Sequence, residues 1–402
     1  MSDPTSRGPL LDAEVVREVQ AFLREEGLDG WLLYEFRGQN WISARLLGVE
    51  DTTRRAFVLV PREGEPRALV HAIEGSHWRG WPWGTARYAG WREMETELAS
   101  LLEGRTRVAM EVSAGDAVPT VDLLPKGVFD LVAEAGCEPV SSGDLVTLFF
   151  SVWSDEQLAA HREAAETVAA VAKDAFAEAA RAIREGAPTT EGALSDWIRR
   201  ALRDRGVTVD VDTHVAVGAG AADPHYAPAG AGETIVRDQL LLIDLWGRTS
   251  ERAVCADQTW MGMMAGSVPD RAREIWEAVR DARDAAVDFL RDGHGEGRTI
   301  RGREVDDVSR GVIEERGWGE FFIHRTGHSI DTKLHGSGPN LDNLESRDER
   351  RLVPGVGFSI EPGIYMPGDI GVRSEINVHY GVDGPEVTPR EPQRDVLLLL
   401  DD

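Results

Sequence analysis

Cysteine is nearly absent from this chain, since Cys137 and Cys255 are the only two among 402 residues. Two thiols in so long a chain do not form a disulfide framework, so we expect both to be buried thiols. Long hydrophobic runs are absent too: the longest, Leu240–Leu245 and Val396–Leu400, fall well short of the roughly 20 residues that cross a bilayer. The first residues, Met1–Pro9, lack the apolar stretch of a secretory signal. These absences predict a cytoplasmic protein that crosses no membrane.

Positive charge is also in short supply. Lysine and arginine number 44 against 70 aspartates and glutamates, which gives a formal net charge of −26. Such a surface repels a phosphate backbone and argues against sequence-independent binding of nucleic acid. An apolar content of 42% is typical of globular proteins, and 402 residues exceed what one ordinary hydrophobic core supports. We therefore expect two globular domains.

The first part of the chain alternates helical and strand patterns, which predicts an α/β domain. Apolar residues at helical spacing occupy Asp12–Glu26. Strand patterns follow at Gly30–Tyr34, Arg55–Pro61 and Arg107–Glu111.

Ser154 and Gln157 have the spacing of a capping box, ahead of a long helical pattern that ends before Gly186. We place the domain boundary there, with residues 1–153 in the first domain and 154–402 in the second. The second domain is predicted to be α+β with mostly antiparallel strands. Its expected helices are Asp270–Asp292 and Arg303–Arg316, and its expected strands are Thr213–Gly218, Gln239–Trp246, Arg252–Met261, Phe321–His324, Gly357–Glu361 and Gly371–His379.

Two acidic residues stand out on consecutive predicted strands. Asp244 lies in the run Leu240–Trp246, which reads as a buried strand, and a bare carboxylate there costs several kcal/mol. Asp257 lies on the next strand after a turn, so a hairpin brings the two carboxylates together. Like charges so close need a cation between them. The pair therefore predicts a metal site.

The same arrangement recurs downstream, where Glu361 ends one predicted strand and Glu375 follows Pro362 and Gly363 on the next. Between the two acid pairs comes His328, preceded by a glycine that permits close approach. Four carboxylates balance the charge of two divalent ions, and such pairs of ions with a bridging hydroxide are hydrolytic. Oxygen-rich ligands with one imidazole favour manganese, with cobalt, iron or zinc as alternatives.

These residues resemble the pita-bread metallopeptidases, the family of methionine aminopeptidase, aminopeptidase P, prolidase and the metal-free creatinase. The resemblance spans the chain, and its specific part is three segments of the second domain. They are Ile243-Asp244-Leu245-Trp246-Gly247, Thr326-Gly327-His328-Ser329 and Ile360-Glu361-Pro362-Gly363-Ile364-Tyr365. It implies a C-terminal pita-bread domain that follows a smaller creatinase-like α/β domain, and a homodimer.

Metal-binding roles follow from the resemblance, position by position. Asp244 would chelate one ion, and His328 with Glu361 would bind the other. Asp257 and Glu375 would bridge the two ions. Glu361 would also handle the proton of the attacking water.

Substrate contacts are implied as well. His225 and His335 match two histidines that flank the scissile bond in the proline-cleaving members, and His324 would help them to orient the substrate and stabilise the tetrahedral intermediate. Tyr365 is assigned to substrate binding. Arg373 either pairs with a ligand carboxylate or meets the carboxylate of a dipeptide.

Taken together, these features predict an Xaa-Pro dipeptidase that acts on small peptides. The alternatives are an Xaa-Pro aminopeptidase on longer peptides, a hydrolase of a non-peptide amide, and a metal-free binding module of the same fold. Elsewhere, three tryptophans in the segment His77–Trp83 either fill the core or line an interface or pocket.

Overall fold

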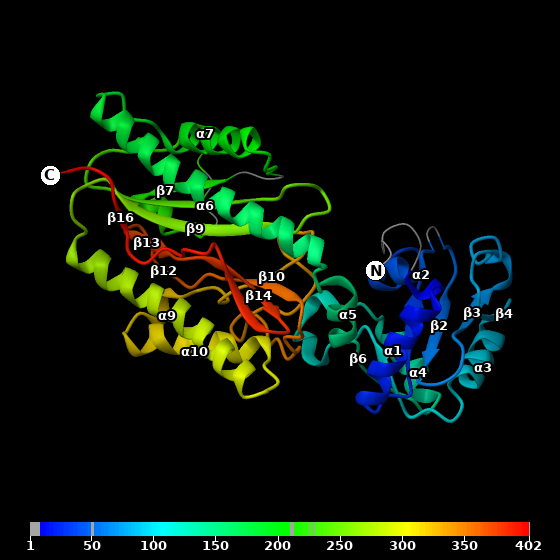
Figure 1. Cartoon of the computed structure of the whole chain (residues 1–402). Coiled ribbons are helices and arrows are strands. Elements are labelled where there is room, and N and C mark those ends of the chain that lie inside the picture. Colours follow the sequence, from blue (N-terminus) through cyan, green and yellow to red (C-terminus); the bar gives the residue numbers. More distant parts are fainter. Residues whose placement is uncertain are drawn as a thin grey trace. The chain divides into compact units, whose positions relative to one another are not determined.

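A computed structural model describes residues 9–49, 52–209, 213–224, 226, 228 and 230–401 of the chain (Figure 1). His225 and the first eight residues of Met1–Pro9 lie outside this part. The chain divides into two compact units, Met1–Val146 and Thr147–Asp402. The sequence puts the domain boundary seven residues later, and helix α5 (Gly143–Phe150) runs through the division between the units.

A mixed six-stranded sheet forms the centre of the first unit, in the order β4-β3-β2-β1-β5-β6. Every residue of β1 is buried, because helices cover both faces of the sheet. Helices α1 and α2 contact β1, whereas α3 and α4 share an apolar cluster with Leu32 and Phe57 on the strands. The elements are α1 Ala13–Glu25, α2 Trp41–Leu47, α3 Trp91–Leu102, α4 Lys126–Glu134, β1 Gly30–Glu35, β2 Ala56–Pro61, β3 Arg67–His71, β4 Gly84–Tyr88, β5 Arg107–Met110 and β6 Glu138–Ser141.

The tryptophan-rich segment is mostly packed inward. Trp78 and Trp81 are buried and meet edge to face, with ring centroids 5.7 Å apart. The indole N–H of Trp83 donates to the carbonyl of Leu10 at 2.9 Å. Core filling therefore accounts for at least two of the three indoles.

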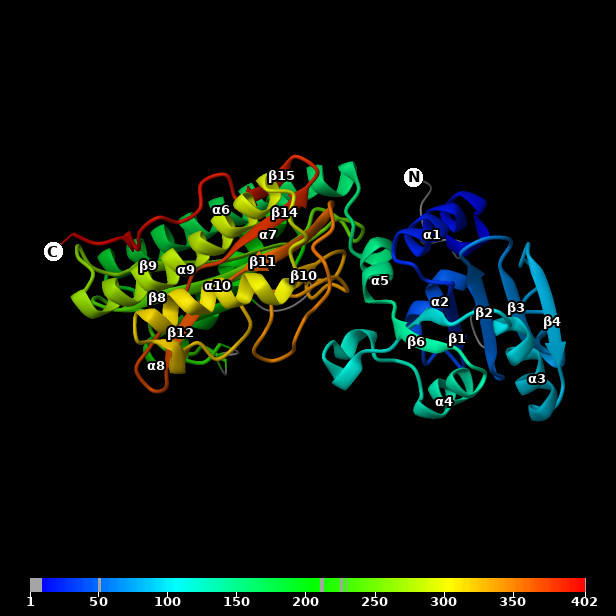
Figure 2. The same cartoon turned by 90° about the horizontal axis from the view of Figure 1, so that it is seen from below.

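The second unit places strands between two layers of helices. Helices α6 and α7 lie on one side of the strands, and α9 and α10 lie on the other (Figures 1 and 2). The capping box predicted at Ser154 and Gln157 starts α6. The elements are α6 Asp155–Arg184, α7 Glu191–Asp204, α8 Gly218–Ala221, α9 Asp270–Gly295, α10 Gly302–Glu315, β7 His214–Val217, β8 Leu240–Gly247, β9 Ala256–Met263, β10 Ser329–Ile330, β11 Val356–Ile360, β12 Gly363–Met366, β13 Ile370–Arg373, β14 Ile376–Gly381, β15 Gly384–Thr388 and β16 Leu397–Leu398.

Three sheets make up the strand layer, in the orders β16-β9-β8-β7, β10-β11-β14-β15 and β12-β13. The pairs β7·β8, β8·β9 and β11·β14 are antiparallel, as the sequence predicts. β9 begins at Ala256 and not at Arg252, because the N–H of Ala253 donates to the carbonyl of Ser250 in a turn. Among the described residues, no helix has both the length and the apolar character of a membrane span.

The strand predicted over Phe321–His324 is wrong. Gly319–Phe321 form a short 3-10 helix, and the residues after it follow an irregular path. The guanidinium of Arg310 on α10 donates to the carbonyls of Phe322 and His324, at 2.9 and 2.8 Å. Because a side chain satisfies these carbonyls, the segment needs no neighbouring strand.

The single strand predicted over Gly371–His379 is two strands, β13 and β14, with Ser374 and Glu375 between them. The N–H of Glu375 donates to the carbonyl of Thr259 on β9, at 3.3 Å. This bond draws the break between the two strands toward β9. Glu375 therefore enters the centre of the unit from a kink, not from a regular strand.

Candidate metal centre

The first acid pair lies on one face of the hairpin β8·β9. Asp244 stands directly opposite Thr259, and Trp246 stands opposite Asp257. Because side chains alternate along a strand, Asp257 and Thr259 point to the same side as Asp244. Asp244 and Asp257 are 6% and 5% exposed, so the hairpin inserts two carboxylates into the interior.

Thr259 links this face to the second acid pair. Its hydroxyl lies 3.2 Å from Oδ1 of Asp244 and 2.8 Å from Oε2 of Glu375. A hydroxyl has one proton to donate, so the two carboxylates share it. The same oxygen accepts a hydrogen bond from Nε of Arg373 at 2.7 Å.

His328 and Glu361 come from neighbouring chain segments at the end of β11. The N–H of Glu361 donates to the carbonyl of Thr326 at 2.7 Å, and that of Ser359 donates to the carbonyl of His328 at 2.9 Å. Such close pairing requires glycine at 327, where an added Cβ would lie 2.0 Å from the carbonyl oxygen of Ser359. The close approach predicted for this glycine is confirmed.

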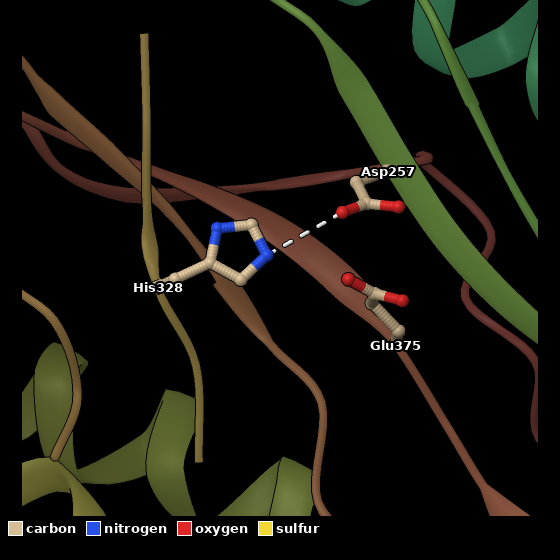
Figure 3. Close-up of side chains that lie close together, drawn as sticks. All are labelled: Asp257, His328 and Glu375. Carbon is tan, nitrogen blue, oxygen red and sulfur yellow. Dashed lines mark ion pairs between the residues drawn. The ribbon is translucent and has the colours of Figure 1, made fainter. Parts of the chain in front are cut away.

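Asp257, His328 and Glu375 converge on one point (Figure 3). One ligand atom of each lies within 4.8 Å of the others. Nε2 of His328 is 3.5 Å from Oδ2 of Asp257 and 3.4 Å from Oε1 of Glu361. Strand β9 and three segments outside the strands thus bring four of the five predicted metal ligands together.

Asp244, the fifth predicted ligand, is joined to the others through the hydroxyl of Thr259 and through the guanidinium of Arg373. The guanidinium of Arg373 forms an ion pair with its Oδ2 atom and lies 4.0 Å from Oε2 of Glu361. Arg373 is itself buried. Of the two roles that the sequence leaves open for it, the structure records the ion pair with a predicted ligand carboxylate, that of Asp244.

The electrostatics of the site differ from acid to acid. Burial raises the pKa of Asp257 to about 6, and the neighbouring charge of Asp244 acts in the same direction. Burial is the largest cause that raises the pKa of Glu375 well above its usual range. The charges of Asp257 and Glu361 raise it further. These two carboxyls resist ionisation as long as no cation lies between them.

The other two acids are held ionised. Burial alone would raise the pKa of Asp244, but the guanidinium of Arg373 and then His214 bring it below its usual value. Partial burial would also raise the pKa of Glu361, but the charges of His328 and then of Arg373 bring it below its usual value. Asp257 and Glu375 therefore bind a proton more readily than an ordinary carboxyl group does, whereas Asp244 and Glu361 are held ionised.

Two observations fit a divalent metal ion here. The buried Oε1 atom of Glu375 has no hydrogen-bond partner among the described residues. Nδ1 of His328 lies 3.1 Å from the carbonyl of Ser329, which can only accept, so Nδ1 carries the proton. That arrangement leaves Nε2 facing two carboxylates, and it is typical of metal-ligating histidines, whose other nitrogen is fixed by a backbone carbonyl.

The predicted catalytic histidines have different surroundings. Nε2 of His324 lies 2.9 Å from Oη of Tyr365, and its Nδ1 lies 2.7 Å from the carbonyl of Arg325. The ring therefore accepts from the tyrosine hydroxyl. His335 packs against His328 at right angles, with ring centroids 4.4 Å apart. The place of His225 lies outside the described residues.

A small pocket opens beside Asp244, between β7 and β12. Tyr365 and Arg373 line it together with His214 and Tyr226. His214 stands directly opposite Asp244 on the ladder β7·β8, with Nδ1 3.5 Å from Oδ2 of the acid. The sequence does not single out His214, because only the register of β7 with β8 brings it opposite Asp244.

Several supporting residues were also missed. Ser359 accepts a hydrogen bond from the N–H of His328 and donates to Glu361, each at 3.0 Å. Asp306 is fully buried, pairs with Arg310 and accepts from the N–H and hydroxyl of Thr326. Because these contacts join segments far apart in the chain, no local pattern indicates them.

Comparison with known proteins decides the family. Residues 160–380, more than half of the chain, match the model of metallopeptidase family M24. The chain belongs to this family. The family that the sequence predicts is thus confirmed, and it is a family of metallopeptidases.

Two known relatives share about a third of their aligned residues with this chain. An Xaa-Pro dipeptidase of Lactobacillus delbrueckii subsp. lactis is 36% identical over 203 residues, which are 50% of this chain and 50% of that protein. An Xaa-Pro dipeptidase of Lactobacillus helveticus is 35% identical over 196 residues, 48% of this chain and 49% of that protein. The aligned part thus spans about half the length of these relatives.

Solved structures share the fold over almost the whole chain. A dipeptidase of Mycobacterium ulcerans has a TM-score of 0.65 and 23% identity, and the match covers 96% of this chain and 97% of that one. An Xaa-Pro dipeptidase of Bacillus anthracis has a TM-score of 0.56 and 23% identity, covering 96% and 99%. These likenesses confirm the predicted pita-bread domain with its smaller N-terminal domain.

Proposed function

We propose that this M24 protein is a dinuclear-metal hydrolase that cleaves the Xaa-Pro bond of dipeptides. The observation that carries the proposal is the convergence of buried acids around His328, with the unpaired Oε1 of Glu375 among them. Gathering four carboxyl groups in the interior is costly unless cations lie among them, so packing alone does not account for the cluster. Support for the substrate comes from the two relatives described as Xaa-Pro dipeptidases.

In this proposal Asp244 would hold one ion, His328 and Glu361 would hold the other, and Asp257 with Glu375 would bind both. When bound, divalent ions would polarise the scissile carbonyl as Lewis acids and make water more acidic. The raised pKa values of Asp257 and Glu375 are consistent with a bridging place, because a cation replaces the proton that each of them prefers.

Glu361 acts as the general base. Its lowered pKa keeps it ionised at neutral pH, and Ser359 holds its Oε1 atom in place. The nitrogen of an Xaa-Pro bond carries no hydrogen and leaves as an amine only after it is protonated. Glu361 takes the proton of the attacking water and passes it to that nitrogen.

Histidines and a tyrosine orient the substrate around this base. His335 lies against His328, and His225 is assigned to the same task from the sequence. His324 fixes the hydroxyl of Tyr365, which lines the pocket beside Asp244. Arg373 supports Asp244 in the structure, and we assign it a place beside the substrate through that same pocket.

A direct assay tests the function. Manganese-loaded protein is incubated with alanyl-proline, with a tripeptide that extends it at the carboxyl end, and with alanyl-alanine as control. Preferred release of proline from the dipeptide supports the proposal. Turnover of the tripeptide alone assigns an aminopeptidase, and turnover of none of them refutes the proposal.

Manganese, a homodimer and a cytoplasmic location belong to the same proposal. What supports manganese is the donor set, four carboxylates and one imidazole, since such oxygen-rich sites suit this ion. Elemental analysis of protein purified without added metal tests the ion. Light scattering tests the dimer.

A further inference from the structure

Strand β9, which carries Asp257, has different partners on its two edges. One edge pairs with β8 along the whole strand. The other edge pairs with β16 at Gly262 and Met263, near the end of β9. Toward the beginning of β9, where Asp257 lies, side chains bond to this second edge.

The carboxamide of Asn377 bonds to both backbone groups of Asp257. Its Oδ1 atom accepts from the N–H of Asp257 at 2.9 Å, and its Nδ2 atom donates to the carbonyl of the same residue at 2.8 Å. A residue on a neighbouring antiparallel strand makes the same pair of bonds with its backbone. The side chain of Asn377 thus takes the place of a neighbouring strand at this point.

Gln393 makes a similar pair of bonds further along the same edge of β9. Its Oε1 atom accepts from the N–H of Met261 at 2.9 Å, and its Nε2 atom donates to the carbonyl of that residue at 2.6 Å. Between the two amides, the N–H of Glu375 donates to the carbonyl of Thr259 at 3.3 Å. Two side-chain amides and one backbone bond therefore hold alternate residues of β9.

Asn377 belongs to the sheet that also positions other predicted ligands. It stands on β14 directly opposite Ser359 on β11, so both side chains lie on one face of that sheet. The hydroxyl of Ser359 accepts from the N–H of His328 and donates to Glu361, each at 3.0 Å. Together with the bonds to Asp257, this pair of polar residues contacts three of the predicted metal ligands.

The bonds to Asn377 oppose the repulsion that acts on Asp257. Its carboxyl is buried, and the charges of Asp244 and Glu361 both disfavour its ionised form. Like charges at such short range push one another apart when no cation lies among them. Because Asn377 bonds to the backbone of Asp257, it resists this displacement and leaves the carboxylate available to a metal ion.

The chemistry of the contact requires a carboxamide. The N–H of Asp257 needs an acceptor and its carbonyl needs a donor, and an amide side chain supplies both. A carboxylate at position 377 would accept but could not donate. An apolar side chain would leave two buried backbone groups unpaired, which costs stability.

We propose that Asn377 is a positioning residue that fixes the backbone of Asp257, so that the carboxylate of Asp257 is in place for both metal ions before they bind. The inference rests on the proposed function, in which Asp257 binds both ions, and deepens it. A ligand that is already fixed loses less freedom when the metal binds, so affinity rises. Asn377 therefore strengthens metal binding through Asp257.

Manganese binding tests the inference without a measurement of turnover. Metal-free protein is titrated with manganese, and the free ion is measured by its electron paramagnetic resonance signal. We expect Asn377→Leu, which keeps the size of the side chain but removes both bonds, to weaken manganese binding about 10- to 100-fold, as for other groups that position metal ligands. The matched control is Gln393→Met, which removes the same pair of bonds at Met261 and should leave the affinity within about twofold.

A double-mutant cycle shows whether Asn377 acts through Asp257. In the Asp257→Asn background, Asn377→Leu should change the manganese affinity by less than about twofold, because no carboxylate remains to be placed. Urea unfolding of the metal-free protein should show similar losses for Asn377→Leu and Gln393→Met, since each leaves two buried backbone groups unpaired. Where leucine prevents folding, Asn377→Ser replaces it and should also weaken manganese binding.

Equal weakening of manganese binding by Asn377→Leu and Gln393→Met overturns the inference, as does a loss that persists in full in the Asp257→Asn background. In either case Asn377 only stabilises the fold. Wild-type manganese affinity in Asn377→Leu or Asn377→Ser overturns it as well.

Failure of the parent proposal looks different. If wild-type protein neither binds manganese nor cleaves alanyl-proline, both proposals fall together. Cleavage of alanyl-proline with a manganese affinity that does not depend on Asn377 removes this inference alone. Manganese binding that depends on Asn377 and Asp257, without cleavage of any peptide, removes the proposed activity and leaves the positioning role in place.

Discussion

Asp257 provides a stability test of the metal centre that requires no substrate. Without metal, burial raises the pKa of its carboxyl from 3.8 in the unfolded chain to about 6 in the fold. The folded protein then binds the proton more tightly than the unfolded chain does. Below pH 3.8 the carboxyl of Asp257 is protonated in both states and costs no stability. Between pH 3.8 and about 6 its ionisation increasingly lowers the free energy of unfolding, and above about pH 6 the full cost is present. Removing the charge should therefore stabilise the metal-free protein at pH 8.

The magnitude follows from the shift. About two pKa units, at about 1.4 kcal/mol each, cost about 3 kcal/mol. Asp257→Asn removes this cost but also removes the interaction with Nε2 of His328 at 3.5 Å. We expect a net gain of about 1–3 kcal/mol in the free energy of unfolding of the second unit at pH 8, and no gain at pH 4.

Scanning calorimetry on chelator-treated protein measures this effect. The exposed turn residue Asp383 supplies the matched control, because Asp383→Asn removes the same charge from the surface and should change little. With manganese present the order should reverse, since the wild type gains a bridging ligand that the asparagine lacks. Destabilisation by Asp257→Asn at pH 8 in the absence of metal would refute the electrostatic account of the site.

Three other predictions concern the same unit. A chelator should lower its melting temperature, and manganese at 100 times its Kd should restore about 2.7 kcal/mol, measured by calorimetry. Arg373→Met should cost about 3–5 kcal/mol in metal-free urea unfolding, because Asp244 then stays buried without its cation, and the loss should shrink once metal binds. Arg310→Met frees the carbonyls of Phe322 and His324 and should lower kcat with metal content unchanged, as steady-state kinetics and elemental analysis can show.

Much of the fold and of the metal centre could be predicted from the sequence, because strong local signals carry them. A carboxylate inside an apolar strand, as at Asp244, has few explanations other than a cation. The hairpin that pairs its strand with that of Asp257 follows from the turn between them. Gly327 indicated a close approach that the structure confirms.

The rest depends on contacts between distant segments. Phe321–His324 look like a strand because they are apolar and short, but Arg310 satisfies their carbonyls from a helix. Glu375 lies at a kink because its backbone bonds to Thr259, 116 residues earlier. His214 joins the site only through the register of β7 with β8. No local pattern encodes such partners.

The central claim is that buried acids of one chain tolerate one another because cations lie among them. A crystal grown with manganese and measured at the manganese absorption edge tests it most directly. The account predicts two anomalous peaks, one within reach of Asp244 and one within reach of His328, with Asp257 and Glu375 touching both. Well-ordered carboxylates with no anomalous peak between them would contradict it.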